Sequence, residues 1–245
     1  MWIFYSPFHT FIHKVLVTAH ECGHWDDITF VATFPFKNNE GIDQGDAYDI
    51  SALNPLNKVP TLVSGEGQVI YGSQAACEYL DGTSKARRMY PEPGPARWDA
   101  VTRLALSDTI FEQTVVMVME QWKPESEWNR GLFEWLWPKF IAGLDKLERD
   151  AERGWDDFDV GHAAMLHAIS YLGFRAEFYE AKDPIYPDFR WRDGRPALST
   201  WFDKAAQRPS VQSHYLKDFV GDSSAEFCQA QVQAVLAAQK QHGTG

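Results

Sequence analysis

Cysteine is scarce in this 245-residue sequence, and no long hydrophobic run occurs in it. The three cysteines, Cys22, Cys77 and Cys228, are odd in number, widely spaced and without a CxxC pattern. We therefore expect neither a disulfide framework nor a cysteine zinc site, and a reducing cytoplasm is the location that fits best. The longest apolar stretch, TVVMVM, is far shorter than the ~20 residues of a membrane span. No secretory signal is evident, because MWIFYSPFH lacks a basic region followed by an apolar one.

Basic residues are also fewer than acidic ones. The chain has 23 lysines and arginines against 34 aspartates and glutamates, which gives a formal net charge of −11. A surface this acidic repels phosphate backbones and anionic lipid, so we expect neither nucleic acid nor a membrane as a partner. Aromatic residues are plentiful at 14%. Such residues form a core and an interface, or they line a pocket for an apolar ligand.

The first 82 residues alternate strand-like and helix-like segments. WIFY is a short apolar strand, and the helix that follows it is expected to end at Gly23. DITFVATF is rich in β-branched and aromatic residues and predicts a second strand. VPTLV and QVIYG, separated by a Gly-Glu-Gly turn, predict a β-hairpin, after which a helix begins with Ser73 as its N-cap. Residues 1–82 are therefore predicted to form a small α/β domain.

Residues 83–95 change the character of the chain, since they combine three prolines with a cluster of basic residues. We interpret this segment as a linker. No convincing strand follows it, so residues 96–245 are predicted to form an all-helical domain. Helices are expected over 96–122, 125–152 with an interruption at Pro138, 160–172, 195–206, 208–218 and 224–240.

One segment, His20-Glu21-Cys22-Gly23-His24, matches the HExxH pattern, in which two histidines one helical turn apart bind zinc and the glutamate activates water. Gly23 is expected to end the helix, however, so His24 would leave the face that His20 occupies. No third ligand follows at the required spacing. We therefore predict no metal, and interpret the histidines as favourable partners of the negative end of the helix dipole.

A cradle for an extended ligand is predicted from NPLNKVPTLV and from the YGSQ that follows it. The Val59-Pro60 bond directly precedes a strand, which makes it a candidate for the cis form found in tight turns. Such a turn leaves the N–H and C=O of Val59 available to a peptide-like ligand. The hydroxyl of Ser73 and the N–H groups at the start of its helix suit a carboxylate.

In this order, these motifs resemble the glutathione transferase family, and in particular its bacterial-type cytosolic members. The resemblance runs through WIFY, SPFHTFIHKV, AHECG, NPLNKVPTL and YGSQAACEYLD, and resumes at FDVGHAAMLHAISYLGFR and RPALSTWFDKAAQRPSV. It implies a thioredoxin-like N-terminal domain, an all-helical C-terminal domain and a homodimer. It also implies glutathione as co-substrate and a role in detoxification.

The resemblance also implies roles for individual residues. Val59 would bind the cysteinyl backbone of glutathione, with Pro60 as the cis-proline. Ser73 would hold the γ-glutamyl carboxylate, and Lys58 would lie near the glycyl end of the tripeptide.

Two departures from the family pattern stand out. Family members usually place Glu, Asp or Gln directly before the serine, whereas this chain has Gly72, so Gln74 is the remaining candidate for the γ-glutamyl amine. The capping box of the sixth family helix, normally Ser/Thr-x-x-Asp, is replaced by Asp159 and His162. Asp159 is expected to cap this helix, with a weakened reciprocal bond from His162.

Activation of glutathione requires a group beside its sulfur, because a thiol with a pKa of about 8.5 is mostly protonated at neutral pH. Alignment on Phe11 and Lys14 places His9 where bacterial-type members carry serine or cysteine. Tyrosine-type members use a tyrosine at the end of the first strand. No cysteine occurs in this turn, so thiol–disulfide exchange is disfavoured. The candidates, each with a purely structural alternative, are His9 first, then Tyr5 and Ser6, then Thr10.

The second substrate is expected between the two domains, beside the long helix that follows the linker. Its apolar stripe is more often helix core than pocket, but the resemblance implies that the start of this helix faces the active site. We therefore expect an apolar, aromatic electrophile. The predicted pocket residues are Phe8, Phe34, Ser107, Asp108, Phe111 and Val115.

These observations predict an enzyme that transfers glutathione to this electrophile or uses glutathione to cleave a bond such as an ether. The alternative is a non-catalytic relative that binds a hydrophobic ligand or a protein partner with the same fold.

Overall fold

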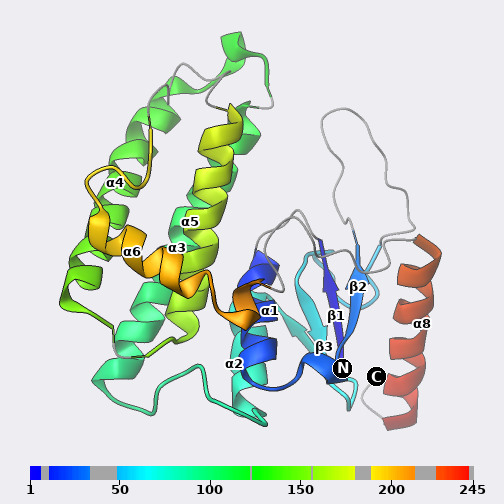
Figure 1. Ribbon diagram of the computed structural model, residues 1–245. Helices are drawn as coiled ribbons and strands as arrows, with labels where there is room; N and C mark the ends of the chain where they lie inside the picture. The colour runs from blue at the N-terminus through cyan, green and yellow to red at the C-terminus, as the bar shows by residue number, and fades with distance from the viewer. Residues whose placement is uncertain are drawn as a thin grey trace. The chain divides into compact units, whose positions relative to one another are not determined.

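The computed structural model describes residues 1–6, 11–33, 49–121, 123–155, 157–179, 189–212 and 225–242. The chain divides into two compact units, the first formed by Met1–Tyr90 with Ser213–Gly245 and the second by Pro91–Gln212. The first unit contains a four-stranded sheet with helices, and every element of the described second unit is a helix. The predicted thioredoxin-like plus all-helical architecture is therefore confirmed (Figure 1).

The first unit follows the order that the sequence predicts: strand, helix, strand, hairpin and helix. One further helix joins it from the C-terminal end of the chain. The elements are β1 (Trp2–Tyr5), α1 (Phe11–Glu21), the 3-10 turn η1 (Trp25–Asp27), β2 (Thr29–Ala32), β3 (Thr61–Val63), β4 (Val69–Tyr71), α2 (Ser73–Gly82) and α8 (Ala225–His242).

The sheet has the strand order β2-β1-β3-β4. β1 and β2 are parallel, as expected for two strands joined through a helix, whereas β3 is antiparallel to β1 and to β4. Successive side chains of a strand point to opposite faces, so each face of the sheet needs a covering layer. In β1, one of the two inner strands, Ile3, Phe4 and Tyr5 are all fully buried, which shows that both faces of the sheet are covered.

Helices cover the two faces of this sheet as separate layers. α1 and α2 pack against each other on one face, and α8 lies on the other (Figure 1). The sequence prediction placed α8 in the helical domain with the rest of residues 96–245, so the structure differs here. The physical reason is the apolar face of α8, which is buried against Phe4, Val31 and Val63 of the sheet.

α1 ends as the sequence predicts, at a glycine in the left-handed region. Gly23 has φ +73°, a conformation that side chains rarely adopt. The N–H of the next residue, His24, donates to the carbonyl of Ala19 over 2.8 Å and closes the last turn of the helix.

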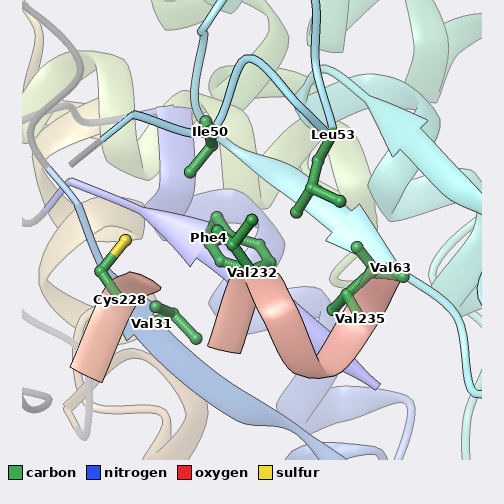
Figure 2. Packing of buried hydrophobic residues seen from close by; sticks show 8 residues of the cluster. All are labelled: Phe4, Val31, Ile50, Leu53, Val63, Cys228, Val232 and Val235. Carbon is green, nitrogen blue, oxygen red and sulfur yellow. The ribbon is translucent and has the colours of Figure 1, made fainter. Parts of the chain in front are cut away.

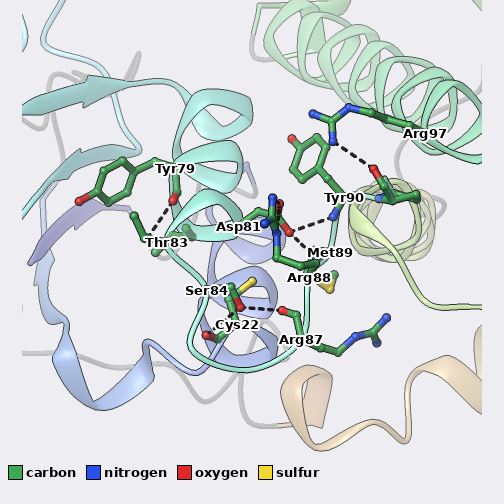
Figure 3. Close-up of polar contacts among 12 residues, drawn as sticks. Cys22, Tyr79, Asp81, Thr83, Ser84, Arg87, Arg88, Met89, Tyr90 and Arg97 are labelled. Atoms are coloured by element: carbon green, nitrogen blue, oxygen red, sulfur yellow. Dashed lines mark hydrogen bonds and ion pairs between the residues drawn. The ribbon is translucent and has the colours of Figure 1, made fainter. Parts of the chain in front are cut away.

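The middle of the predicted linker is tied to the end of α2 by the buried carboxylate of Asp81 (Figure 3). Its Oδ1 accepts the backbone N–H groups of Met89 and Tyr90, and its Oδ2 accepts Nε of Arg88 over 2.8 Å. Hydrogen bonds to an ionised group are stronger than neutral ones. This part of the chain is therefore held to the first unit.

The first helix of the second unit begins at Pro95, the last residue of the predicted linker. Pro138 was expected to interrupt the next long helix, but that helix continues through it. Pro138 is exposed, while Phe133, Leu136 and Phe140 beside it are buried and hold the helix in place. The elements are α3 (Pro95–Gln121), the 3-10 turn η3 (Glu125–Glu127), α4 (Arg130–Arg153), α5 (Val160–Tyr179), α6 (Pro196–Ala205) and α7 (Pro209–Gln212).

α5 begins with a reciprocal pair of hydrogen bonds. The N–H of His162 donates to Oδ1 of Asp159 over 3.0 Å, and the N–H of Asp159 donates back to Nδ1 of His162 over 3.2 Å. The bond that the sequence predicted to be weakened is therefore present, because the imidazole nitrogen replaces the usual side-chain oxygen as acceptor. Arg103 of α3 adds two hydrogen bonds to the same carboxylate, at 3.0 and 2.9 Å.

Burial and charge keep this cap in one protonation state. Burial lowers the pKa of His162 below 6.5 and outweighs the opposing hydrogen bond with Asp159. Burial by itself raises the pKa of Asp159, but contacts with His162 and Arg103 outweigh it and hold this pKa below 3.8. The cap therefore combines a carboxylate with a neutral imidazole.

We expect the cap to lose stability in acid. A histidine with a lowered folded-state pKa contributes stability above pH 6.5 and loses it as the pH falls, because the unfolded chain binds the proton first. The contribution of Asp159 is lost in turn below pH 3.8. Thermal unfolding of His162→Gln between about pH 7 and pH 5 should lack the part of the decline due to this histidine, since the amide oxygen replaces Nδ1. Gln233→Ala, which changes no ionisable group, should keep the wild-type slope, and the same slope in His162→Gln would contradict the assignment.

Candidate functional site

The two predicted halves of the cradle lie at the same end of the β3–β4 hairpin. Thr61 of β3 is paired with Tyr71 of β4, so the residues just outside this pair face each other. The N–H of Gly72 donates to the carbonyl of Pro60 over 3.2 Å. Segments separated by about a dozen residues along the chain are thereby brought together.

The Val59-Pro60 bond is cis, as the sequence predicted. Pro60 is buried, whereas Val59 is only partly buried. Within the described part of the chain, neither the N–H nor the C=O of Val59 takes part in a hydrogen bond. Because a free N–H and C=O on one residue are the pairing groups of a strand edge, Val59 offers a partner to an extended peptide backbone.

The N-cap of α2 lies one residue earlier than predicted, at Gly72 and not at Ser73. Gly72 has φ +82°, which explains why glycine stands here and not a residue with a longer side chain. Ser73 is thus the first residue of α2, and its hydroxyl makes no hydrogen bond to any described residue. The first N–H groups of a helix have no partner within it, so this end of α2 suits a carboxylate. Gln74, the next residue, is exposed.

Asn54 organises the loop that leads into β3, a role that was not predicted from the sequence. Its buried amide donates to the carbonyl of Lys58 and to the hydroxyl of Thr61, both over 3.0 Å, and its Oδ1 accepts the N–H of Leu56 over 3.1 Å. An asparagine directly before a proline is a turn signal that could have pointed to it. The side chain of Lys58, predicted to lie near the glycyl end of the ligand, is exposed.

The structure describes two of the four candidate residues for thiol activation. Tyr5 and Ser6 are both fully buried at the end of β1, and the ring of Tyr5 meets Phe30 edge-on. This burial favours a structural role for the two residues over contact with a bound sulfur. His9 and Thr10 lie outside the described residues.

The three cysteines lie in the interior of the fold. Cys22, Cys77 and Cys228 are free and buried. Burial raises the pKa of the Cys22 thiol to about 11, and burial also raises the pKa of Cys228. The hydroxyl of Thr18 contacts the sulfur of Cys77 at 3.5 Å. Protonated, inaccessible thiols do not act as nucleophiles.

The predicted pocket residues of α3 fall on two faces of that helix. Ser107 and Phe111 are buried in the second unit, where the Phe111 ring packs on His167 with 4.9 Å between centroids. Asp108 and Val115 lie on a neighbouring face and are partly exposed. The burial of the first pair favours a core role, so the pocket prediction depends chiefly on Asp108 and Val115. Phe8 and Phe34 lie outside the described residues.

His24 of the HExxH segment makes contacts that stabilise the fold. Nε2 of His24 lies 3.1 Å from the carbonyl of Leu80 and 3.3 Å from the hydroxyl of Thr83, so this ring joins α1 to the end of α2. Among the described residues, no group of three or more potential ligands is placed to hold a metal ion. The described helices also include none that is long and apolar enough to cross a membrane.

Known proteins resemble this chain in the part that carries the candidate site. Residues 8–83 match the family model of the glutathione S-transferase N-terminal domain. The uncharacterized GST-like protein YibF of Escherichia coli strain K12 is 28% identical over 169 residues, which cover 67% of this chain and 78% of YibF.

Solved structures share the fold of most of the chain. A glutathione transferase family member from Pseudomonas fluorescens Pf-5, with bound glutathione, has a TM-score of 0.73 and 28% identity, covering 87% of this chain and 97% of that one. A glutathione S-transferase from Methylobacillus flagellatus KT, also with glutathione bound, has a TM-score of 0.73 and 23% identity, covering 87% and 98%. At 23% identity, the second likeness concerns the fold alone.

We expect Asn54→Ala to loosen the loop that carries Val59. The change leaves the N–H of Leu56 without its partner and removes one of the two hydrogen bonds to the carbonyl of Lys58, which keeps the bond from the hydroxyl of Thr61. It should lower the free energy of unfolding by about 1–3 kcal/mol. Urea unfolding measures this loss. Gln68→Ala, which shortens an exposed amide in the same hairpin, should stay within about 0.5 kcal/mol of wild type. An equal effect of the two variants would show that Asn54 does not organise the loop.

Proposed function

Because this chain belongs to the glutathione transferase family, we propose that it binds glutathione and activates its thiol for attack on an electrophilic carbon. The thiolate forms a carbon–sulfur bond, and the leaving group departs with the electron pair of its bond to carbon. The product is a glutathione conjugate. When the bond that breaks is an ether, the departing oxygen takes up a proton and the second product is an alcohol or a phenol. A homodimer in the cytoplasm and a role in detoxification accompany this proposal.

The observation that carries the proposal is the juxtaposition of Val59 and Ser73. Among the residues that the structure describes, none pairs with the backbone N–H or C=O of Val59 or with the hydroxyl of Ser73 at the start of α2. The hydrogen bond from Gly72 to Pro60 places the two at one end of the hairpin. A tripeptide with a backbone amide in its middle and a carboxylate at its γ-glutamyl end matches both groups.

Each part of glutathione then has a partner. The cysteinyl N–H and C=O pair with Val59 as in a short strand addition. The γ-glutamyl carboxylate accepts the Ser73 hydroxyl and the first N–H groups of α2, where the helix dipole favours negative charge. The exposed Lys58 attracts the glycyl carboxylate, and Gln74 is available to the γ-glutamyl amine.

Activation of the thiol is assigned to His9, with Thr10, Tyr5 and Ser6 as alternatives. The burial of Tyr5 and Ser6 supports this order. A residue just before α1 sits near the positive end of the helix dipole, which disfavours a cationic imidazole. A neutral His9 donates an N–H to the sulfur or accepts its proton.

The second substrate is proposed to be an apolar, aromatic electrophile beside α3. The partly exposed Asp108 and Val115 are its candidate contacts on this helix. The other members of the proposed pocket are Phe8, Phe34, Ser107 and Phe111.

Glutathione binding by the wild type, measured by titration calorimetry, tests the proposal directly. Ser73→Ala removes a hydroxyl that donates to a carboxylate and should weaken binding by about 1.5–3 kcal/mol, roughly ten- to a hundredfold in Kd. Thr109→Ala, which removes an exposed hydroxyl from α3, should bind as the wild type does. A wild type that does not bind glutathione would leave a non-catalytic binding protein as the better account.

His9→Ala tests the activating residue. We expect turnover to fall roughly a hundredfold, as is usual on loss of a group that handles a proton, with little change in glutathione affinity. The acid limb of the pH–rate profile should move, because the titrating group is lost. A profile that stays unchanged would transfer the role to Thr10, Tyr5 or Ser6.

A further inference from the structure

The C-terminal helix α8 forms a shared core with the sheet and with the segment that leads to the cradle. Cys228, Val232 and Val235 lie at helical spacing on one face of α8, and none is more than 2% exposed. Figure 2 shows that this face points at side chains from three strands and from the segment before β3. These partners are Phe4, Val31, Val63, Ile50 and Leu53.

Three glutamine side chains fix α8 along its length. Gln229 donates to the carbonyl of Asp49 over 3.2 Å, and Gln239 donates to the carbonyl of Gly67 over 2.9 Å. Gln231 accepts the indole N–H of Trp2 over 3.1 Å. Bonds at both ends and in the middle of the helix prevent it from sliding or turning over the sheet, so its apolar face keeps one register.

The segment that begins at Asp49 carries this contact to the cradle. Ile50 and Leu53 are buried in the shared core, Asn54 turns the chain, and the side chain of Val59 packs against the same core. Val59 therefore has its side chain held beneath the loop while its backbone N–H and C=O stay available. The orientation of these two polar groups follows from where that side chain is anchored.

We propose that α8 is a positioning element for glutathione, acting through Val232 and Val235 on the segment that ends at Val59. This inference rests on the proposed function. α8 itself touches no reacting atom: it holds the loop in the form that binds the cysteinyl backbone. Its removal or loosening should weaken glutathione binding and leave the chemistry of the bound thiol in place, because the activating group precedes α1.

Val232→Ala in the full-length chain tests the proposal, since it opens space in the shared core without adding charge. We expect the Kd of glutathione, from titration calorimetry, to rise about fivefold, equivalent to about 1 kcal/mol. The kcat at saturating glutathione should stay within about twofold of wild type, because the binding that is lost is the same in the ground state and in the transition state. Gln233→Ala, at an exposed position of the same helix, is the matched control and should bind as the wild type does.

Gln229→Ala provides a second variant that creates no space in the core. It removes the bond to Asp49 and should also raise the Kd of glutathione without lowering kcat. If both variants fold and bind glutathione with the wild-type Kd, α8 only stabilises the unit and the proposal is wrong.

Amide hydrogen exchange separates this inference from the proposed function, because it needs no ligand. In Val232→Ala, the amides of residues 49–60 should exchange faster than in the wild type, while those of α1 keep their protection. A wild type that does not bind glutathione would refute the proposed function, but it would not refute the effect of α8 on residues 49–60. Unchanged exchange over 49–60 would end the positioning role, whatever the wild type binds.

Discussion

The candidate ligand site depends on the antiparallel pairing of β3 with β4. The hairpin places the end of one loop beside the start of a helix, and the N–H of Gly72 joins them at the carbonyl of Pro60. Backbone groups that the sheet leaves unpaired at Val59 then face the open end of α2 at Ser73. A one-residue slip in this register would turn Val59 and the hairpin side chains to the other face. The candidate site is therefore a consequence of strand register.

Local signals in the sequence were enough to predict most of this unit. β-branched runs marked the strands, Gly23 marked the end of α1, and the Val59-Pro60 pair before a strand pointed to the cis bond that the structure contains. The start of α2 was misplaced by one residue, because a serine is a better N-cap than most residues and the positive φ of Gly72 is not visible in a sequence.

Contacts between distant segments could not be predicted in this way. The spacing of Cys228, Val232 and Val235 shows that α8 has an apolar face, but an apolar face does not say which surface buries it. The role of Asn54 depends on where the chain returns at Lys58 and Thr61. In the same way, the Asp159 cap was predicted, whereas the acceptor role of Nδ1 in His162 depends on the ring orientation. Such features are decided by three-dimensional packing.

The chemistry proposed for the site is constrained by what surrounds it. The three cysteines are buried, and burial raises the pKa of Cys22 and Cys228, so the reactive sulfur must come from the ligand. Tyr5 and Ser6 are enclosed at the end of β1, and the proposal therefore assigns the activation of that sulfur to His9. In this proposal the binding groups come from the segment before β3 and from α2, and the activating group comes from a separate segment. This separation allows affinity and turnover to be changed independently.

A crystal structure of the protein soaked with glutathione tests the account most directly. We predict that the cysteinyl N–H and C=O lie at about 2.9 Å from the C=O and N–H of Val59, with the γ-glutamyl carboxylate on the hydroxyl of Ser73. The sulfur should then point toward the turn before α1. Glutathione bound elsewhere on the chain, with Val59 and Ser73 left unoccupied, would contradict the account.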